Sequence, residues 1–366
     1  MRRRNASAMP ALSAAGPTHV QSTLTGDPRL RLGLTARSTA ALRFALLCFV
    51  SLLSTHARGR TTFDPTRGLS SSELPSGIHV VEAAPPDRIL IAGGTFRMGA
   101  TNDDMMDGFA LCKEQVGHAT CDNNSVKAHL VAEGVSHRVD LSPYLLDRTE
   151  VSLGNYARCV AVGACSTSGT PIDDRRFDRP ELPVTFVTWD QASTYCAWKK
   201  GRLPTEAEWE RAAKGPSRVY FKAPGASEPL VKVDARELPF PWGTLWNNKL
   251  ANHGTLESEP TDDSDGERYL APVEAYAASK SPEGILQLAG NAGEWVSDFF
   301  EVDERGISYP SQNAVNPKGP ARGAYHVIRG GSFLKPSFWV RTTARTRIVS
   351  PRDVDVGFRC AYDVAR

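Results

Sequence analysis

The segment LPVTFVTWDQASTYCAWKKGRLPTEAEWERAAKG (182–215) contains two helix starts of the same design. Thr188 is followed three residues later by Gln191, and Thr205 is followed three residues later by Glu208, so each pair can form a capping box. After the first pair, Ala192, Tyr195, Cys196 and Lys199 recur at spacings of three and four, which predicts a helix with these residues on one face. The second helix is predicted to run to the glycine that closes the segment.

One further helix and three short strands are expected outside this segment. Ser152 precedes LGNYARCVAV and Gly163 follows it, which gives that helix a hydroxyl N-cap and a glycine stop. Strands are expected at 88–92, 325–329 and 356–361. Glycine, proline and asparagine recur too often elsewhere for long elements. The predicted fold class is therefore an irregular α+β domain with little regular secondary structure.

The composition is that of a folded globular protein. The chain has 366 residues, of which 41% are hydrophobic and 23% are charged, and this excludes disordered and collagen-like classes. Residues 1–57 hold seven arginines and one acid, which leaves 36 basic and 40 acidic side chains in the rest. A domain with this small excess of acidic side chains lacks the surplus of basic residues needed for phosphate contacts, so nucleic-acid binding is not expected.

The first 86 residues are predicted to lie outside the folded domain. The apolar run 40–53 is followed by small residues ending at Ala57, which predicts a secretory signal over 1–57. The run has 14 residues, whereas a membrane-spanning helix needs about 20, so no stable span is expected. A Ser-, Pro- and Gly-rich flexible linker is predicted over 58–86, and one domain over 87–366. The expected location is secreted or periplasmic.

Six cysteines remain after the predicted signal, and an even number in an exported chain predicts three disulfides. Six cysteines can pair in many ways, and sequence alone does not choose. The spacings suggest two local pairs and leave a long-range one: Cys112 with Cys121, Cys159 with Cys165, and Cys196 with Cys360. A zinc site is not expected, because there is no CxxC pair and the histidines lack ligand spacing.

Common nucleotide and hydrolase motifs are absent from the sequence: it has no GxGxxG, GxxxxGK[ST] or GxSxG. Two segments are rich in oxygen ligands. The acidic cluster 262–266 resembles the start of an EF-hand loop, but Pro272 stands where its closing acid should be. In GNAGEW (290–295), Asn291 and Glu294 bracket two small residues whose carbonyls could face a cation.

Seven segments between residues 88 and 362 carry a resemblance. They are ILIAGGTFRMGA (89–100), PYLLDRTEVSLGNYARCV (143–160), the segment 182–215, FPWG (240–243), ILQLAGNAGEWVSDFF (285–300), VIRGGSF (327–333) and VGFRCA (356–361). In this order they resemble the formylglycine-generating enzyme, or sulfatase-modifying factor, family. The resemblance implies a C-type-lectin-like fold and the family's long disulfide, here Cys196 with Cys360.

The same resemblance implies two calcium sites made of oxygen ligands, the type that Ca²⁺ prefers. The corresponding residues are Asn252, His253, Asp265 and Glu267 for the first site, and Gln287, Gly290, Ala292 and Glu294 for the second. His253, Glu267, Gly290 and Ala292 would contribute carbonyl oxygens. Gln287 departs from the asparagine of the family, and its extra methylene moves the amide oxygen.

The catalytic metal site of the family does not carry over. Family enzymes hold Cu(I) between two cysteines, and Lys335 and Val340 stand at those positions here. Cu(I) needs thiolate or thioether ligands, which neither residue supplies, so copper is not expected. Ser332 of the GGS motif is retained, and Gly293 replaces a tryptophan usual in the family.

Three functions are compatible with these residues. The leading hypothesis is a secreted, calcium-stabilised, non-oxidising domain that binds a peptide, glycan or protein in the family's substrate groove. The alternative is an oxidase that converts a substrate cysteine of sulfatases to formylglycine. A third resembles the iron-dependent sulfoxide synthases that share this domain, but these take histidine ligands from a helical domain that residues 1–86 do not contain.

Overall fold

The computed structural model describes residues 87–216, 218–221, 231–234, 238–255, 262–303 and 313–364. All of them fall in one compact unit. The predicted signal region 1–57 and the linker 58–86 lie outside the described residues. No helix of the described part is long and apolar enough to cross a membrane.

Six α-helices and two short 3-10 helices occur in the described residues. They are α1 (Asn102–Val116), α2 (His118–Cys121), α3 (Asn124–Ala132), α4 (Leu153–Ala161), α5 (Trp189–Trp198), α6 (Glu206–Lys214), η1 (Ala277–Ser279) and η2 (Ser337–Trp339). The three predicted helices are confirmed as α4, α5 and α6. Their hydroxyl N-caps are Ser152, Thr188 and Thr205, and the latter two form complete capping boxes.

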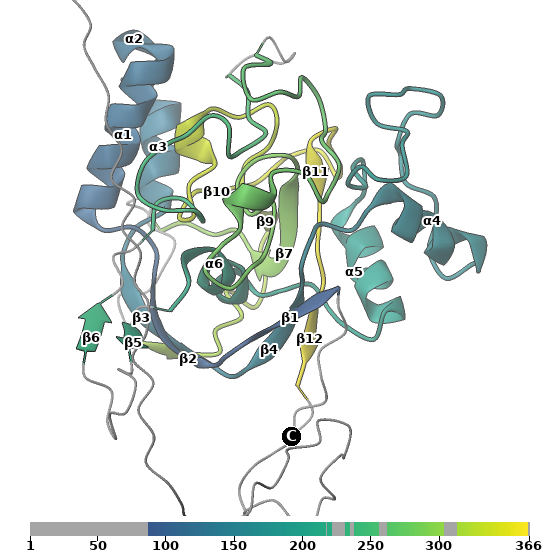
Figure 1. The fold of residues 1–366 in the computed structure, drawn as a ribbon, viewed down its shortest axis with the longest axis horizontal. Coiled ribbons are helices and arrows are strands. Elements are labelled where there is room, and N and C mark those ends of the chain that lie inside the picture. Colours follow the sequence, from purple (N-terminus) through teal and green to yellow (C-terminus); the bar gives the residue numbers. More distant parts are fainter. Residues whose placement is uncertain are drawn as a thin grey trace, which may run out of the picture. The chain divides into compact units, whose positions relative to one another are not determined.

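The strands form four small sheets (Figure 1). Their orders are β1 (Arg88–Ile91), β4 (Tyr144–Asp147), β12 (Ala361–Asp363); β10 (Arg345–Thr346), β9 (His326–Arg329), β7 (Gly293–Phe299), β11 (Val356–Gly357); β2 (Gly94–Met98), β3 (His137–Leu141), β8 (Ala314–Val315); and the pair β5 (Arg218–Phe221), β6 (Val231–Asp234). In the second sheet β7 is central, antiparallel to β9 and parallel to β11. Val356 pairs with Gly293, which brings the predicted GNAGEW segment beside the C-terminal VGFRCA segment.

Two sequence expectations are wrong in detail. The strand expected at 356–361 is two strands, β11 and β12, which belong to different sheets. The expectation of no further long element fails at α1, which has 15 residues. Its central Gly108 is required by packing, because a Cβ there would lie 2.6 Å from the Arg341 guanidinium. A glycine that weakens a helix in isolation here allows α1 to approach a distant segment.

Helix α6 packs against β2, β7 and β9 at the centre of the fold (Figure 1). Trp209 fills this centre and is completely buried. The charged side chains of the helix are buried too, so they must be paired. Glu210 pairs with Lys214 at 2.8 Å, and Glu206 pairs with Arg345 at 2.7 Å. These ion pairs allow a highly charged helix to occupy the interior beside β7.

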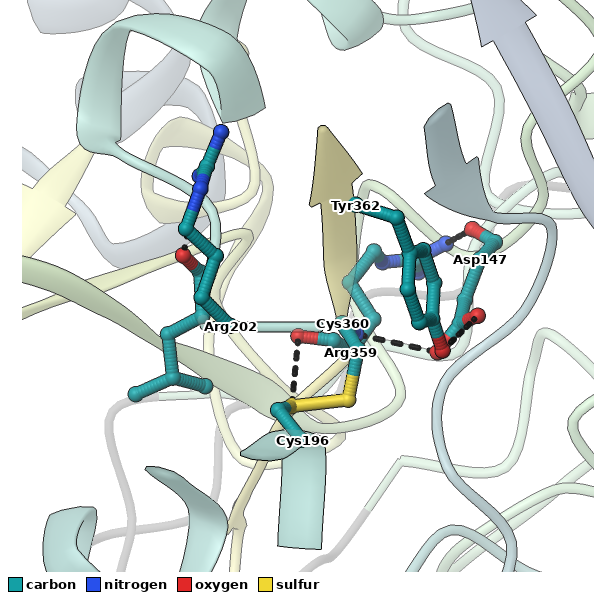
Figure 2. Close-up of a disulfide and its surroundings, with 7 residues drawn as sticks. Asp147, Cys196, Arg202, Arg359, Cys360 and Tyr362 are labelled. Carbon is teal, nitrogen blue, oxygen red and sulfur yellow. Dashed lines mark hydrogen bonds between the residues drawn. A yellow bond between two sulfur atoms is a disulfide. The ribbon is translucent and has the colours of Figure 1, made fainter. Parts of the chain in front are cut away.

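All three expected disulfides are present: Cys112–Cys121, Cys159–Cys165 and Cys196–Cys360, with Cα separations of 5.8, 5.3 and 5.4 Å. The long one joins α5 to the residue just before β12. Figure 2 shows Asp147 beside it, where this carboxylate accepts hydrogen bonds from the Cys360 amide and the Tyr362 hydroxyl, both at 3.0 Å. Burial raises the pKa of Asp147 to about 6.

Candidate functional site

The residues of the first predicted calcium site lie together. The Asp265 carboxylate accepts hydrogen bonds from the backbone N–H groups of His253 at 2.7 Å and Glu267 at 2.9 Å, so one side chain joins both ligand segments. The Asn252 amide nitrogen donates to Tyr269 O at 2.8 Å, which fixes the orientation of that amide. Its oxygen, Asn252 Oδ1, is buried without a hydrogen-bond partner. A buried acceptor without a partner fits a cation ligand.

The residues of the second predicted site are arranged differently. Gln287 Oε1 is also buried without a hydrogen-bond partner. Glu294, however, is completely buried and both of its oxygens are engaged. Arg359 donates to Oε1 at 2.6 Å and to Oε2 at 2.7 Å, and Trp209 Nε1 donates to Oε2 at 2.8 Å. A guanidinium of the chain therefore supplies a positive charge beside the carboxylate expected to bind calcium.

Asn291 connects the two predicted sites. Its Oδ1 accepts from Asn252 Nδ2 at 3.0 Å, and its Nδ2 donates to Glu150 at 3.0 Å. The adjacent Gly290 has φ +83°, and a Cβ there would lie 2.1 Å from Asn252 O, so only glycine fits. Glu150 also accepts from the Ala292 amide at 3.1 Å. Burial, followed by the charge of Glu294, raises the pKa of Glu150 to about 8.

Glu150 was missed by the sequence reasoning. Its only signal was an acid two residues before the N-cap Ser152, and charged residues at such positions are usually exposed. Its side chain instead points inward to the GNAGEW turn, through bonds to residues more than 140 positions away.

The family's copper positions carry no metal ligands in this chain. Lys335 Nζ lies 3.6 Å from Asp355 Oδ2 and 5.4 Å from the centre of the Trp339 ring. Val340 is completely buried in an apolar cluster with Phe240. Ser332 Oγ donates to the same Asp355 oxygen at 2.6 Å. The retained serine and the substituted lysine thus share one carboxylate, and the arrangement is that of a structural polar contact.

The space beside Lys335 is small. A cavity of about 20 Å³, room for roughly one water, is lined by Lys335, Trp339 and His129 among others. The His129 ring packs edge-on against Trp339 at 4.9 Å. Gln115 of α1 accepts a hydrogen bond from the Ser337 amide at 2.8 Å. The helices α1 and α3 therefore contact the segment that holds both former copper positions.

A larger cavity lies elsewhere in the described residues. It has a volume of about 690 Å³ and is lined by Trp189, Arg202, Asn316 and Lys318 among others, but by none of the predicted site residues. Arg202 is already paired there with Glu208 at 2.7 Å.

Comparison with known proteins identifies the family of this chain. The formylglycine-generating enzyme of Thermomonospora curvata is 28% identical over 333 residues, covering 75% of this chain and 93% of that protein. The mouse inactive C-alpha-formylglycine-generating enzyme 2 is 29% identical over 203 residues, and the match spans about half of each chain (52% and 52%). The structure of PvdO from Pseudomonas aeruginosa has the same fold, with a TM-score of 0.51 and 23% identity over 75% of this chain and 93% of that one. The model of the sulfatase-modifying factor enzyme 1-like domain matches residues 78–364, so the chain belongs to this family, that of the formylglycine-generating enzymes.

Proposed function

We propose that this protein is a non-oxidising member of its family: a secreted or periplasmic, calcium-stabilised domain that binds a peptide, glycan or protein in the groove its relatives use for substrate. The observation that carries the proposal is the replacement of both copper-binding cysteines by Lys335 and Val340. The three disulfides support an exported location, because such bonds persist in oxidising compartments.

The surroundings of both residues support the absence of a copper centre. The Lys335 ammonium has no lone pair to donate while it is paired with Asp355, and Val340 has no donor atom. All six cysteines of the described residues are in disulfides, so none of them offers a free thiolate. One relative bears the word inactive in its name, which is compatible with loss of catalysis within this family.

The alternative function is oxidation of a substrate cysteine to formylglycine. Its support is the match to 93% of the Thermomonospora curvata enzyme and the retained Ser332. Neither Lys335 nor Val340, however, supplies the soft ligand that Cu(I) requires.

Calcium is supported more strongly at the first position than at the second. Asn252 and Asp265 would hold the ion there, together with the carbonyls of His253 and Glu267. The support is the unpartnered Asn252 oxygen near the Asp265 carboxylate, which accepts hydrogen bonds from the backbone N–H groups of His253 and Glu267. Gln287 offers a similar oxygen at the second position, but Glu294 is already bound by Arg359.

The test is incubation of the purified protein with a Cys-x-Pro-x-Arg peptide, copper and oxygen, followed by mass spectrometry. We expect no conversion and no retained copper, while the Thermomonospora curvata enzyme assayed in parallel converts the peptide. Lys335→Cys alone should stay inactive, because one thiolate holds Cu(I) weakly, whereas Lys335→Cys with Val340→Cys should bind copper. The control is Lys335→Ser with Val340→Ser, and turnover by the unmodified protein would overturn the proposal.

A further inference from the structure

A polar cleft lies beside the segment that carries Lys335. Its volume is about 380 Å³, and it is lined by Gln115, Trp246, Asn247, Asn248, His253 and Asp262, with Ser264 at its edge. The cleft adjoins the former copper region, because the Gly254 amide donates to Lys335 O at 3.0 Å. The cleft is large enough for one or two sugar rings, and its volume is within the usual range of small-molecule binding sites.

The cleft contains a buried nitrogen without a partner. His253 is only 3% exposed, and its Nε2 has no hydrogen-bond partner. Its other ring nitrogen, Nδ1, lies 3.5 Å from Gly254 O and 3.8 Å from Asp262 Oδ2. Buried polar groups normally have partners, so a polar ligand atom would complete this site.

The surrounding polar groups are held in place by their own contacts. Asn248 donates to Ser264 Oγ at 3.2 Å, and Asp262 accepts from the Ser264 amide at 2.8 Å. Asn247 accepts from the Lys249 amide at 2.9 Å, which leaves its NH₂ group for other partners. The lining therefore mixes fixed amide donors and acceptors with one carboxylate.

An aromatic ring stands among these polar groups. Trp246 packs edge-on against His253 at 5.0 Å and, with tilted rings, against Phe240 at 5.3 Å, and it remains half-buried. Because the tryptophan is held from behind by other rings, it presents a rigid apolar surface to the cleft.

We propose that this cleft binds a hexopyranose unit of a glycan. A pyranose combines an apolar C–H face, which suits Trp246, with hydroxyl groups that both donate and accept, which suit Asn247, Asn248 and His253 Nε2. None of the described lining residues is a lysine or arginine that would select a phosphate or sulfate. The inference rests on the proposed function, in which this region binds rather than oxidises, and it names the ligand class of that surface.

The experiment uses the purified mature protein in calcium-containing buffer and a panel of methyl glycosides of glucose, galactose, mannose and N-acetylglucosamine. Isothermal titration calorimetry should show saturable binding of at least one of them at millimolar concentrations. Asn248→Ala should weaken that binding at least fivefold and Trp246→Ala at least tenfold. Asn124→Ala, which changes an exposed asparagine of α3 outside the cleft, is the matched control and should bind as the unmodified protein does.

Trp246→Phe retains an aromatic ring and keeps the test valid if Trp246→Ala does not fold; it should weaken binding less than threefold. The proposal is overturned if no glycoside of the panel saturates up to about 50 mM, or if binding is unchanged in Asn248→Ala. It is also overturned if the cleft binds a Cys-x-Pro-x-Arg peptide and none of the sugars. Parallel oxidase assays separate the outcomes, since absence of sugar binding without peptide oxidation removes only this inference.

Discussion

Two hydrogen bonds between Asn252 and Asn291 join the two predicted calcium positions, yet the positions are stabilised in different ways. The first lies in loop segments, and its Asp265 accepts backbone N–H groups while Asn252 Oδ1 has no partner. The second lies at the start of β7 and in the turn before it, and its Glu294 is bound by Arg359, which precedes the disulfide-bonded Cys360. Similar sets of oxygen ligands in the sequence can therefore fold into different arrangements. One leaves a buried amide oxygen without a partner, whereas the other balances its carboxylate with a guanidinium of the chain.

Burial explains why the second position needs a cation from the chain. Glu294 and Arg359 are both completely inaccessible, and a lone buried carboxylate would be strongly unfavourable. At the first position, burial and, to a smaller extent, the neighbouring Asp262 raise the pKa of Asp265. Two nearby carboxyl groups without such a guanidinium are the situation in which a bound calcium ion stabilises most.

The largest effect is expected from the disulfide beside the second position. In the chain-entropy model, Cys196→Ala with Cys360→Ala should lower the free energy of unfolding by roughly 5 kcal/mol, because the sequence separation is 164. Cys159→Ala with Cys165→Ala, with a separation of 6, should cost roughly 2 kcal/mol. Urea unfolding of both double variants measures the difference. Equal losses would show that the long bridge does not restrain the C-terminal strands more than a local one.

The buried ion pair is expected to have the next largest effect. Glu294→Leu leaves the Arg359 guanidinium without its carboxylate and should destabilise the protein by about 3–5 kcal/mol. Adding Arg359→Met should recover much of this loss, because an apolar pair removes the unbalanced charge. Both unfolding free energies should be compared in calcium and in chelator. If Glu294→Leu lowers the unfolding free energy in calcium but not in chelator, the result would instead assign this carboxylate to a bound calcium ion.

Calcium itself should have a moderate effect, and mainly through the first position. At a calcium concentration of about 100 times Kd, binding to the folded state alone adds about 2.7 kcal/mol, or about 5 to 10 °C in Tm. Asp265→Asn should remove most of this shift, whereas Gln287→Ala should retain it. Thermal unfolding with and without chelator is the measurement. If Gln287→Ala removes the shift and Asp265→Asn does not, the comparison between the two positions is reversed.

The parts of the fold that sequence predicted depend on local interactions. The helices α4, α5 and α6 were predicted from residues within their own first turns, and their caps are as expected. Helix α1 has a similar signal, a capping box between Thr101 and Asp104, but Gly108 obscured it. The reason for that glycine is Arg341, which lies more than 230 residues further along the chain.

The same limit applies to the candidate site. The family resemblance implied that Asn252, Asp265 and Glu294 are oxygen ligands, and the structure places Asn252 and Asp265 in neighbouring loop segments. It could not identify Arg359 as the partner of Glu294, because that contact joins residues 65 positions apart. The pairing of Lys335 with Asp355 is likewise a property of the folded chain. The type of side chain available at each position was predictable, whereas the residues that balance its charge in the folded chain were not.

The last prediction concerns Asp298, a buried acid on the same strand as Glu294. It accepts hydrogen bonds from the Glu206 amide and the Ser297 hydroxyl, both at 2.9 Å. Burial, followed by the charge of Glu206, raises the pKa of Asp298 to about 7. The folded protein therefore keeps a proton that the unfolded chain loses at lower pH.

The sign of the resulting pH dependence follows from this difference. The stability contributed by Asp298 is fully present below about pH 4, falls as pH rises toward 7, and is constant above that, with a slope of at most about 1.4 kcal/mol per pH unit. Asp298→Asn keeps an oxygen acceptor for the Glu206 amide but does not titrate. Urea unfolding of both proteins between pH 4.5 and 8 should show the unmodified protein losing stability relative to the variant up to about pH 7. Parallel curves would mean that Asp298 is ionised in the folded state and that both acids of β7 have their charges balanced.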